Sequence, residues 1–358
     1  MTNQRDLNRI SPSAATAQPT ATGSPDGQRM RAIVQKEYGT ADVLAMAEIE
    51  RPTIAANEVL VQVHAAGLDR GTWHLMAGMP YAARLVAGLR APKNPVPGLD
   101  VAGVVAAVGG EVTRFQPGDE VFGVSKGSFA EFAAAREDKL ARKPSKLTFE
   151  QAAAVPVSGM TALRGLSDVG HLEAGQKVLI VGASGGVGSY AVQIAKTLGA
   201  EVTGVCSTSK VDLVRALGAD HVIDYTKDDF ADGKTLYDLI LDVGGDSALS
   251  RLRRALTPKG TLVIVGGEGG GNWIGMGRQL RALALSPFVG QRLTILAPKE
   301  HYTFLERLTE LIEDDRLVPA VEKTYPLNEM PDAMRQLVAG RARGKLVITI
   351  IDPTAATT

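Results

Sequence analysis

Three glycines spaced three residues apart are the residues whose types and positions indicate chemistry most directly. They lie where a short apolar run, 177–181, meets an amphipathic helix expected over 188–198. Glycines at this spacing allow a tight turn, close approach of a phosphate to the backbone and packing of helix on strand, and the helix N-terminus attracts phosphate charge. We therefore predict a dinucleotide-binding loop rather than a plain glycine-rich turn. Its predicted contact residues are Gly182, Ser184, Gly185, Gly186, Val187 and Gly188.

The end of the next expected strand, 201–206, bears on which dinucleotide binds. Sites that prefer NAD(H) usually carry Asp or Glu there, which accepts a hydrogen bond from the ribose 2′-OH. This chain has Ser207 and Lys210 instead, and their hydroxyl and ammonium groups suit a 2′-phosphate. The sequence therefore favours NADP(H) over NAD(H), with a solvated Lys210 that opens a helix as the alternative.

Strands and helices are expected to alternate around the glycine loop. This alternation is typical of a doubly wound parallel sheet with right-handed crossovers. The expected strands of that sheet are 177–181, 201–206, 221–223, 239–242, 262–265 and 293–296. Before it, the chain reads as β-rich, with strands expected at 59–64, 102–108, 120–124 and 129–134. After Pro298, a helix at about 301–314 and a strand at 345–351 are expected to return to the first domain.

Composition excludes several classes of function. A chain of 358 residues with 45% hydrophobic and 22% charged residues predicts two globular domains. Acidic and basic residues balance to zero formal charge, which offers no field for nucleic acid or anionic lipid. The single cysteine, Cys206, excludes an internal disulfide and indicates a reducing compartment, so we expect a cytoplasmic location. The uncharged run 178–195 is too rich in glycine and polar residues for a membrane span.

The first 29 residues differ in composition from the rest of the chain. They are rich in Ser, Thr, Ala, Pro and Gln and offer too few apolar residues for a core, which predicts a disordered tail. An organelle transit peptide is the alternative, because the segment contains arginines and serines. Two acidic residues, Asp6 and Asp26, and three prolines weigh against that alternative.

The order of segments resembles the medium-chain dehydrogenase/reductase superfamily, particularly its zinc-free quinone oxidoreductase branch. The resemblance covers residues 30–352. It rests on AAGLDRGTWHLMAG (65–78), PVPGLDVAGVVAAVG (95–109), RFQPGDEVFG (114–123), FAEF (129–132), AAVPVSGMTAL (153–163), GASGGVG (182–188), LGADHVIDY (217–225) and GKLVI (344–348). It implies a GroES-like β-barrel catalytic domain at 30–155, completed by 298–352, and a Rossmann domain at 156–297, with tails at 1–29 and 353–358.

The resemblance also implies further contacts with the cofactor. Thr161 is expected against the nicotinamide, and the glycines at two strand ends are expected beneath that half of the cofactor. Ser207, Lys210 and Tyr225 are expected around the adenosine phosphate. A plain packing role is the alternative for Tyr225, and ordinary tight turns are the alternative for the glycines. The remaining contact residues are Gly244, Gly266, Gly267 and Lys345.

The positions that bind zinc in related alcohol dehydrogenases carry other residues here. The position of the ligand cysteine is Asp69, and the histidine of the relatives' Gly-His-Glu motif is replaced by Leu99. Tetrahedral zinc needs three protein ligands and a water, and the five histidines show no ligand spacing. We therefore expect no zinc.

Without a metal, reduction of an electrophilic acceptor needs less assistance than oxidation of an alcohol. The resemblance places the catalytic segment at Asp69, Trp73, His74 and Tyr81. Tyr81 could donate to a carbonyl oxygen, and Trp73 could form a flat apolar wall. Purely structural roles are the alternative, including pairing of Asp69 with Arg70, because quinone oxidoreductases commonly have Asn at the position of Asp69.

These observations predict NADPH-dependent transfer of hydride to a quinone or an α,β-unsaturated carbonyl. The alternatives are an alcohol dehydrogenase and a non-catalytic NADPH-binding redox sensor. The resemblance also implies a homodimer joined through the last Rossmann strand, at 293–296.

Overall fold

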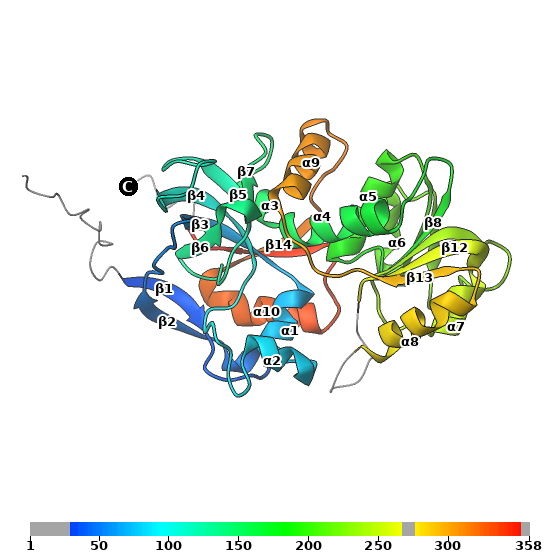
Figure 1. The fold of residues 1–358 in the computed structure, drawn as a ribbon, viewed down its shortest axis with the longest axis horizontal. Coiled ribbons are helices and arrows are strands. Elements are labelled where there is room, and N and C mark those ends of the chain that lie inside the picture. The colour runs from blue at the N-terminus through cyan, green and yellow to red at the C-terminus, as the bar shows by residue number, and fades with distance from the viewer. Residues whose placement is uncertain (1–28, 267–275, 352–358) are drawn as a thin grey trace, which may run out of the picture.

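The computed structural model describes residues 29–266 and 276–351, and Figure 1 shows two lobes built on separate sheets. The six-stranded sheet has the order β10-β9-β8-β11-β12-β13, with every neighbouring pair parallel. Its strands are β8 (Lys177–Val181), β9 (Glu201–Cys206), β10 (His221–Asp224), β11 (Tyr237–Asp242), β12 (Leu256–Ile264) and β13 (Arg292–Ile295). This order confirms the predicted doubly wound sheet, and β13 lies at its edge.

Helices follow the strands of this sheet, as right-handed crossovers require. The helix α4 packs against α5 and α9 and continues directly into a π-helical segment, η4. The helices of this lobe are α4 (Pro156–Leu163), η4 (Arg164–Val169), α5 (Gly186–Thr197), η5 (Thr208–Lys210), α6 (Val211–Ala216), α7 (Leu249–Arg254), α8 (Gly277–Leu285) and η6 (Ser286–Phe288).

The other lobe is built on a seven-stranded sheet with the order β14-β15-β3-β4-β5-β7, from which β6 branches by pairing with β3. The last strand of the chain, β15, pairs antiparallel with β3 of this sheet. The strands of the sheet are β3 (Glu58–Leu68), β4 (Asp100–Val108), β5 (Glu120–Val124), β6 (Phe132–Arg136), β7 (Leu140–Arg142), β14 (Val321–Pro326) and β15 (Lys345–Thr349).

Short helices connect and cover this second sheet. Asp69 caps α1, and the capping box of α3 is formed by Thr148 and Gln151. The helices are η1 (Ala41–Val43), α1 (Arg70–Ala77), η2 (Tyr81–Ala83), α2 (Arg84–Ala87), η3 (Glu137–Lys139), α3 (Phe149–Ala153), α9 (Tyr302–Glu313), η7 (Leu327–Glu329) and α10 (Met330–Val338). None of the helices in the described part of the chain has the length and apolar character that crossing a bilayer requires.

One hydrophobic cluster joins the two lobes. It contains Ala65 of β3 and Phe122 of β5 together with Val178 of β8 and Leu305 of α9, all with essentially no exposed surface. The burial of these apolar side chains is the main contribution to the free energy that holds the two lobes together. The glycine loop after β8 and the strands of the second lobe are therefore fixed relative to each other by packing.

Several elements differ from the sequence-based expectation. A hairpin of β1 (Arg29–Val34) and β2 (Ala45–Glu50) was not predicted, because the burial along β1 does not strictly alternate. The tail expected to end at residue 29 is wrong at its last residue, since Arg29 begins β1; the rest of that tail and the tail at 353–358 lie outside the described residues. The fourth expected strand of the first domain begins at Phe132 rather than at Phe129.

Candidate cofactor and catalytic site

Each of the three spaced glycines meets a different steric requirement. Gly182 has a φ of 87°, in the left-handed region, and a Cβ there would lie 3.0 Å from the backbone nitrogen of Gly244. A Cβ on Gly188 would lie 2.1 Å from the carbonyl oxygen of Gly182. A Cβ on Gly185 would meet nothing nearer than 3.5 Å. The loop thus contains one turn glycine, one packing glycine and one, Gly185, at which a Cβ would make only ordinary contact; that side of Gly185 is called the open face below.

The open face of this loop lies at the N-terminus of α5, a helix of 12 residues. The first amides of a helix have no acceptor within the helix, so they are available to an anion. The carbonyl of Ser184 accepts from the Gly344 amide at 3.0 Å, which brings the segment before β15 against the loop. A buried Ser184 and an unobstructed Gly185 fit a pyrophosphate group.

Lys345 lies directly beneath the loop and is 1% exposed. Its ammonium donates to Asp100 Oδ2 at 3.0 Å and to Ser158 Oγ at 3.2 Å. A Cβ on Gly186 would lie 3.1 Å from Cδ of Lys345. The side chain therefore connects strand β15 to β4 and α4 at the point where the glycine loop begins its helix.

Asp100 is fully buried and was not predicted as a site residue. Its Oδ1 accepts from the Val157 amide at 2.8 Å. Burial raises the pKa of Asp100 to about 6, although the Lys345 ammonium acts in the opposite direction. Because the ion pair joins residues 245 positions apart, no local pattern in the sequence indicates it.

The residues expected around the adenosine phosphate gather at the carboxyl ends of β9 and β10. Ser207 precedes η5, and Tyr225 is 57% exposed. Lys210 is half-buried, and its ammonium donates to the carbonyls of Gly340 at 3.0 Å and Ala342 at 2.8 Å. Burial lowers the pKa of Lys210. The lysine is therefore held against the loop before β15 rather than extended into solvent, unlike the solvated alternative.

A carboxylate that the sequence analysis did not weigh lies among these residues. Asp224 ends β10, and its carboxylate accepts from the hydroxyls of Thr208 and Thr226. These hydrogen bonds lower the pKa of Asp224 to about 2. The carboxylate oxygens are occupied locally and hold the turn that begins at Ser207 in place.

The residues expected at the nicotinamide end lie on three elements. Gly244 follows β11, and its amide donates to the Val181 carbonyl at 3.0 Å. Gly266 follows β12, and its amide donates to the Asp242 carbonyl. Thr161 lies in α4, where its hydroxyl donates to the Val157 carbonyl at 2.6 Å. Gly267 lies outside the described residues.

Asp69 lies at the start of α1 and is 7% exposed. Its Oδ1 accepts from the Thr72 amide at 2.8 Å, which is an N-cap interaction. Its Oδ2 is buried and has no hydrogen-bond partner in the described part of the chain. A buried carboxylate oxygen without a partner is costly, so this atom is available to a group that enters the site.

The three ring residues of the predicted catalytic segment have different surroundings. Trp73 and His74 follow each other in α1 with ring centroids 4.6 Å apart, and Trp73 packs on the core of its lobe. Nδ1 of His74 lies 3.0 Å from the Met79 carbonyl and braces the turn after α1. Tyr81 is 39% exposed, with the Arg84 guanidinium over its ring. Trp73 and His74 therefore have structural contacts, whereas the ring of Tyr81 remains accessible.

The described residues give no set of metal ligands at the position where related dehydrogenases bind zinc. Within residues 29–266 and 276–351, no three His, Cys, Asp or Glu side chains are grouped so that they could hold a metal ion. Leu99 supplies no donor atom beside Asp69. The residues present do not fit the tetrahedral zinc site.

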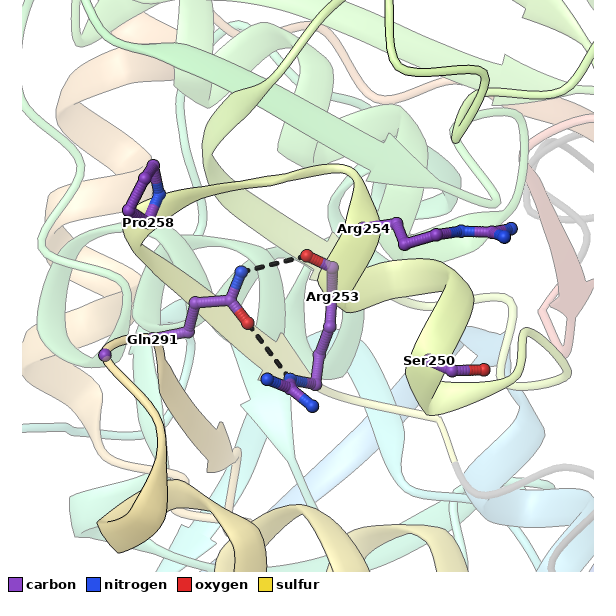
Figure 2. Close-up of a pocket in the computed structure, with 6 residues that line it drawn as sticks. Ser250, Arg253, Arg254, Pro258 and Gln291 are labelled. Carbon is purple, nitrogen blue, oxygen red and sulfur yellow. Dashed lines mark hydrogen bonds between the residues drawn. The ribbon is translucent and has the colours of Figure 1, made fainter.

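Two surface depressions in the described structure lie away from the glycine loop. The first, of about 480 Å³, is lined by Ser250, Arg253, Arg254, Pro258, Gly290 and Gln291. Figure 2 shows that Arg253 and Gln291 form two reciprocal hydrogen bonds there. The second lies at the amino end of the sheet around Gln176 and Asp238. Neither contains a predicted site residue.

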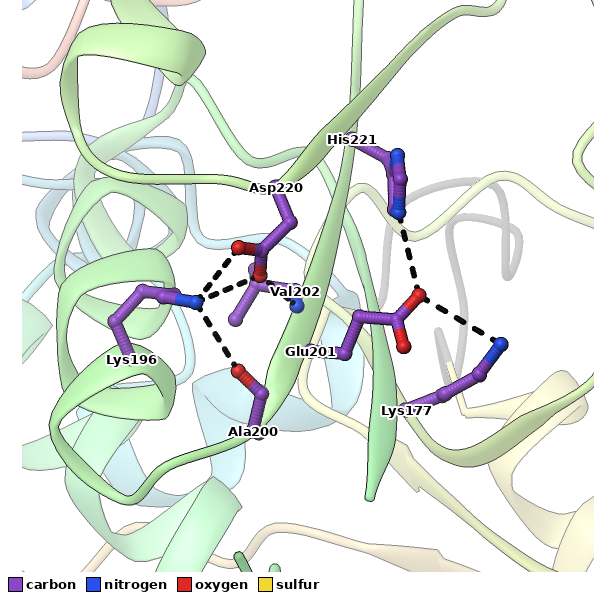
Figure 3. Close-up of polar contacts among 7 residues, drawn as sticks. All are labelled: Lys177, Lys196, Ala200, Glu201, Val202, Asp220 and His221. Atoms are coloured by element: carbon purple, nitrogen blue, oxygen red, sulfur yellow. Dashed lines mark hydrogen bonds and ion pairs between the residues drawn. The ribbon is translucent and has the colours of Figure 1, made fainter. Parts of the chain in front are cut away.

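Polar contacts join side chains at the amino ends of β8, β9 and β10 and at the C-terminal end of α5 (Figure 3). Lys196 of α5 binds both carboxylate oxygens of Asp220 at 2.8 Å, and that carboxylate accepts from the Val202 amide at 2.7 Å. Glu201 contacts Lys177 and His221. The contact of Lys196 with Asp220 anchors the C-terminal end of α5 to the sheet, so the N-terminus of the helix is held at the loop.

Fold and loop together define a two-lobed dinucleotide-binding protein of the dehydrogenase class. Residues 55–145 match the alcohol dehydrogenase GroES-like domain, and residues 217–348 match a family described as zinc-binding dehydrogenases. The chain belongs to the medium-chain dehydrogenase/reductase superfamily, in its quinone oxidoreductase-like branch. This membership confirms the predicted combination of a GroES-like domain with a Rossmann-type sheet.

Three related proteins illustrate the branch. A mitochondrial NAD(P)H oxidoreductase from Mus musculus is 34% identical over 92% of each chain. A chloroplastic NADPH-dependent alkenal/one oxidoreductase from Arabidopsis thaliana is 33% identical over 95% of this chain and 85% of its own. The solved structure of the quinone oxidoreductase from Coxiella burnetii is 29% identical, with a TM-score of 0.81 over 90% of this chain and all of that chain.

The expected cytoplasmic location is wrong by this comparison. The mouse relative is named as mitochondrial, as are the proteins of the same name from Bos taurus and Homo sapiens. The expectation rested on a single cysteine, Cys206. A reducing environment is not restricted to the cytoplasm, so the absence of disulfides cannot separate these compartments.

Proposed function

We propose that this chain is a zinc-independent reductase that uses NADPH to reduce quinones or α,β-unsaturated carbonyls. The observation that carries the proposal is the loop from Gly182 to Gly188. Along the chain, its three spaced glycines provide the turn, the open face and the packing contact. NADPH supplies the hydride when it is bound. The names of the relatives, which include alkenal/one and quinone oxidoreductases, support the same substrate class.

Different residues at the strand ends bind different parts of the cofactor. The first amides of α5 bind the pyrophosphate, and Ser207, Lys210 and Tyr225 bind the 2′-phosphate. Gly244 and Gly266 leave room for the nicotinamide half, and Thr161 lies against it. Gly267 is a further proposed contact and lies outside the described residues. Lys345 adds positive charge beneath the loop, where its ammonium is held by Asp100.

The catalytic segment orients the acceptor and stabilises the charge that develops on its oxygen. Tyr81 donates a hydrogen bond to that oxygen, and Trp73 provides an apolar wall. His74 holds the turn on which Tyr81 lies, whereas the carboxylate of Asp69, with its unpartnered Oδ2, opposes negative charge on the acceptor oxygen. Asp69 and Leu99 stand at the positions of two zinc ligands in the relatives, and reduction of an activated acceptor needs less assistance from a Lewis acid than oxidation of an alcohol.

Two further features of the proposal concern zinc and assembly. Independence from zinc is supported by Leu99, which stands where the relatives have a ligand histidine. A homodimer is supported by the edge position of β13, because an unpaired edge strand favours pairing with a second copy.

The test of the proposal is steady-state turnover with a panel of acceptors in a buffer that contains EDTA. We expect NADPH to reduce 9,10-phenanthrenequinone and small enones, and NADH to be a poorer donor. Oxidation of simple alcohols that occurs only when the EDTA is replaced by zinc would favour the alcohol dehydrogenase alternative. Tight NADPH binding without turnover of any acceptor would favour the redox-sensor alternative.

Lys210→Ala tests the cofactor preference. Because the ammonium is proposed to bind the 2′-phosphate, the variant should raise the KM for NADPH about tenfold or more and leave the KM for NADH unchanged. Lys227→Ala is the matched control, since Lys227 is an exposed lysine paired with Asp224 at the same edge. If the KM rises equally for both cofactors, Lys210 only holds the loop before β15 and does not bind the 2′-phosphate.

Substitutions in the catalytic segment test its assignment. Tyr81→Phe removes one donor to the developing charge, so kcat should fall at least about tenfold. Asp69→Asn preserves the helix cap but replaces a carboxylate with an amide donor, so kcat should rise. Tyr302→Phe, in α9, is the control for loss of a phenol. If kcat is unchanged in both site variants, the catalytic segment is assigned wrongly.

A further inference from the structure

An arginine in the Rossmann lobe contacts two turns at the carboxyl edge of the sheet. Arg278 lies in the first turn of α8, and its side chain is 14% exposed. Nη1 donates to Asp242 Oδ2 and, at 3.0 Å, to the Ser247 carbonyl. Nη2 donates to the Gly266 carbonyl at 3.1 Å. One guanidinium group therefore holds the turn after β11 and the turn after β12 together.

The acidic partner of this arginine is fully buried. Asp242 is the last residue of β11, where it pairs with Val181 of β8 on one side and Ile264 of β12 on the other. Its Oδ1 accepts from the Gly245 amide at 3.3 Å. Burial raises the pKa of Asp242, and Arg278 opposes that shift. The charges of the carboxylate and the guanidinium thus compensate each other at the carboxyl end of β11.

A second side chain of the same helix contacts the same turn. Gln279, which is 7% exposed, donates from Nε2 to the Gly266 carbonyl at 3.3 Å. Gly266 in turn packs closely, because a Cβ there would lie 2.5 Å from the Val243 carbonyl oxygen. Helix α8 therefore fixes the position of the backbone at Gly266 through two donors.

The turn after β11 lies at the point where the order of strands reverses, and the turn after β12 lies beside it. The chain proceeds outward from β8 through β9 to β10, then returns to β11 on the other side of β8. A dinucleotide binds across this switch point, with one half on each side. The adenosine residues lie at β9 and β10, so the nicotinamide half lies over β11 and β12.

From this arrangement we infer that Arg278 is a positioning residue for the nicotinamide half of the cofactor. It sets the spacing between the turns that contain Gly244 and Gly266, and it does so without contact with the reacting atoms. The inference rests on the proposed function, because it concerns how the cofactor of that reaction is held. The neighbouring adenosine half, at β9 and β10, is independent of this contact.

Arginine is required for this role because the acceptors are spread over three groups. Its planar group presents donors on two Nη atoms in a fixed geometry, whereas a lysine presents one compact ammonium. Arg278→Lys retains a positive charge beside Asp242, so the buried carboxylate stays compensated and the fold is preserved. The lysine cannot donate to the carbonyls of Ser247 and Gly266 at the same time.

The test compares whole and half cofactors. Dissociation constants for NADPH and for 2′,5′-ADP, which is its adenosine half, are measured by calorimetry for the wild type, Arg278→Lys and Arg281→Lys. Arg281 is exposed on the same helix and serves as the matched control. We expect Arg278→Lys to weaken NADPH about tenfold and 2′,5′-ADP by less than about twofold, and Arg281→Lys to change neither.

Steady-state kinetics give a second measurement on the same variants. A misplaced nicotinamide lowers kcat more than it raises the KM for the acceptor, since distance and orientation limit the hydride step. NADPH affinity equal to that of the wild type would overturn the inference. Equal weakening of NADPH and 2′,5′-ADP would also overturn it, because the damage would then extend to the whole sheet edge.

The wild-type measurements keep this inference separate from the proposed function. A wild type that binds NADPH but reduces no acceptor contradicts the proposed reaction. The variant-to-wild-type ratio of the dissociation constants still tests the position of the nicotinamide half in that case.

Discussion

Gly188→Ala is expected to abolish NADPH binding and to lower the free energy of unfolding by about 3 kcal/mol. The added Cβ would lie 2.1 Å from the Gly182 carbonyl oxygen and 2.7 Å from Cα of Ala183. Both contacts are backbone atoms of the loop itself, so α5 must move away from β8. Urea unfolding measures the stability, and a fluorescence titration with NADPH measures binding.

Two other glycines provide the controls for this variant. Gly185→Ala places a Cβ on the open face, so the stability should fall by no more than about 1 kcal/mol, from the weaker N-cap of α5, while NADPH affinity falls. Gly110→Ala meets nothing within 4 Å and should change neither quantity. Wild-type NADPH affinity in Gly188→Ala would show that the loop does not bind the pyrophosphate.

Lys345→Met is expected to destabilise the protein by about 4 kcal/mol at pH 8, because it leaves the fully buried Asp100 carboxylate without its cation. The pKa of Asp100 is already raised to about 6 by burial, and removal of Lys345 raises it further. A carboxyl group whose pKa is raised in the folded state contributes stability at low pH and loses it as the pH rises through that pKa. The cost of Lys345→Met should therefore be smaller at pH 5 than at pH 8.

A double variant separates charge from packing in this pair. Asp100→Leu combined with Lys345→Met removes both charges, and it should recover most of the stability that Lys345→Met loses. Chemical unfolding at pH 5 and pH 8 gives the comparison. A destabilisation by Lys345→Met that is the same at both pH values would show that the loss comes from packing rather than from the buried charge.

The parallel sheet could be predicted because each of its strands is a short apolar run with its own turn signal. The residues 177–181 and 201–206 have the same bounds in sequence and structure. The glycine loop was predictable for the same reason: turn, packing and close approach are local requirements that leave a local pattern. The return of the last strand to the first lobe follows from the completed Rossmann unit.

Long-range polar contacts could not be predicted from local patterns. Asp100 lies on β4 and Lys345 on β15, and only the order of strands in the sheet brings these two side chains together. Arg278 reaches Asp242 from a helix that begins 35 residues later in the chain. The hairpin of β1 and β2 and the strand β14 have mixed exposure along their length, which leaves no regular alternation. Such contacts depend on tertiary packing, which overrides local preference.

The predicted catalytic residues illustrate the same limit. The N-cap role of Asp69 follows from its position before α1, but its unpartnered Oδ2 depends on side chains from the rest of the lobe. The contact of His74 with the Met79 carbonyl is local, yet nothing in the sequence distinguishes it from a catalytic histidine. The roles of Trp73 and Tyr81 in catalysis stay predictions.

The transfer of label from NADPH that carries two deuterium atoms at nicotinamide C4 to an enone tests the central claim most directly. Mass spectrometry and NMR of the product locate the deuterium after incubation with the purified protein and EDTA. The account predicts a saturated ketone with deuterium at the β-carbon. Recovery of the unchanged enone, or a product without deuterium, from protein that binds NADPH would contradict it.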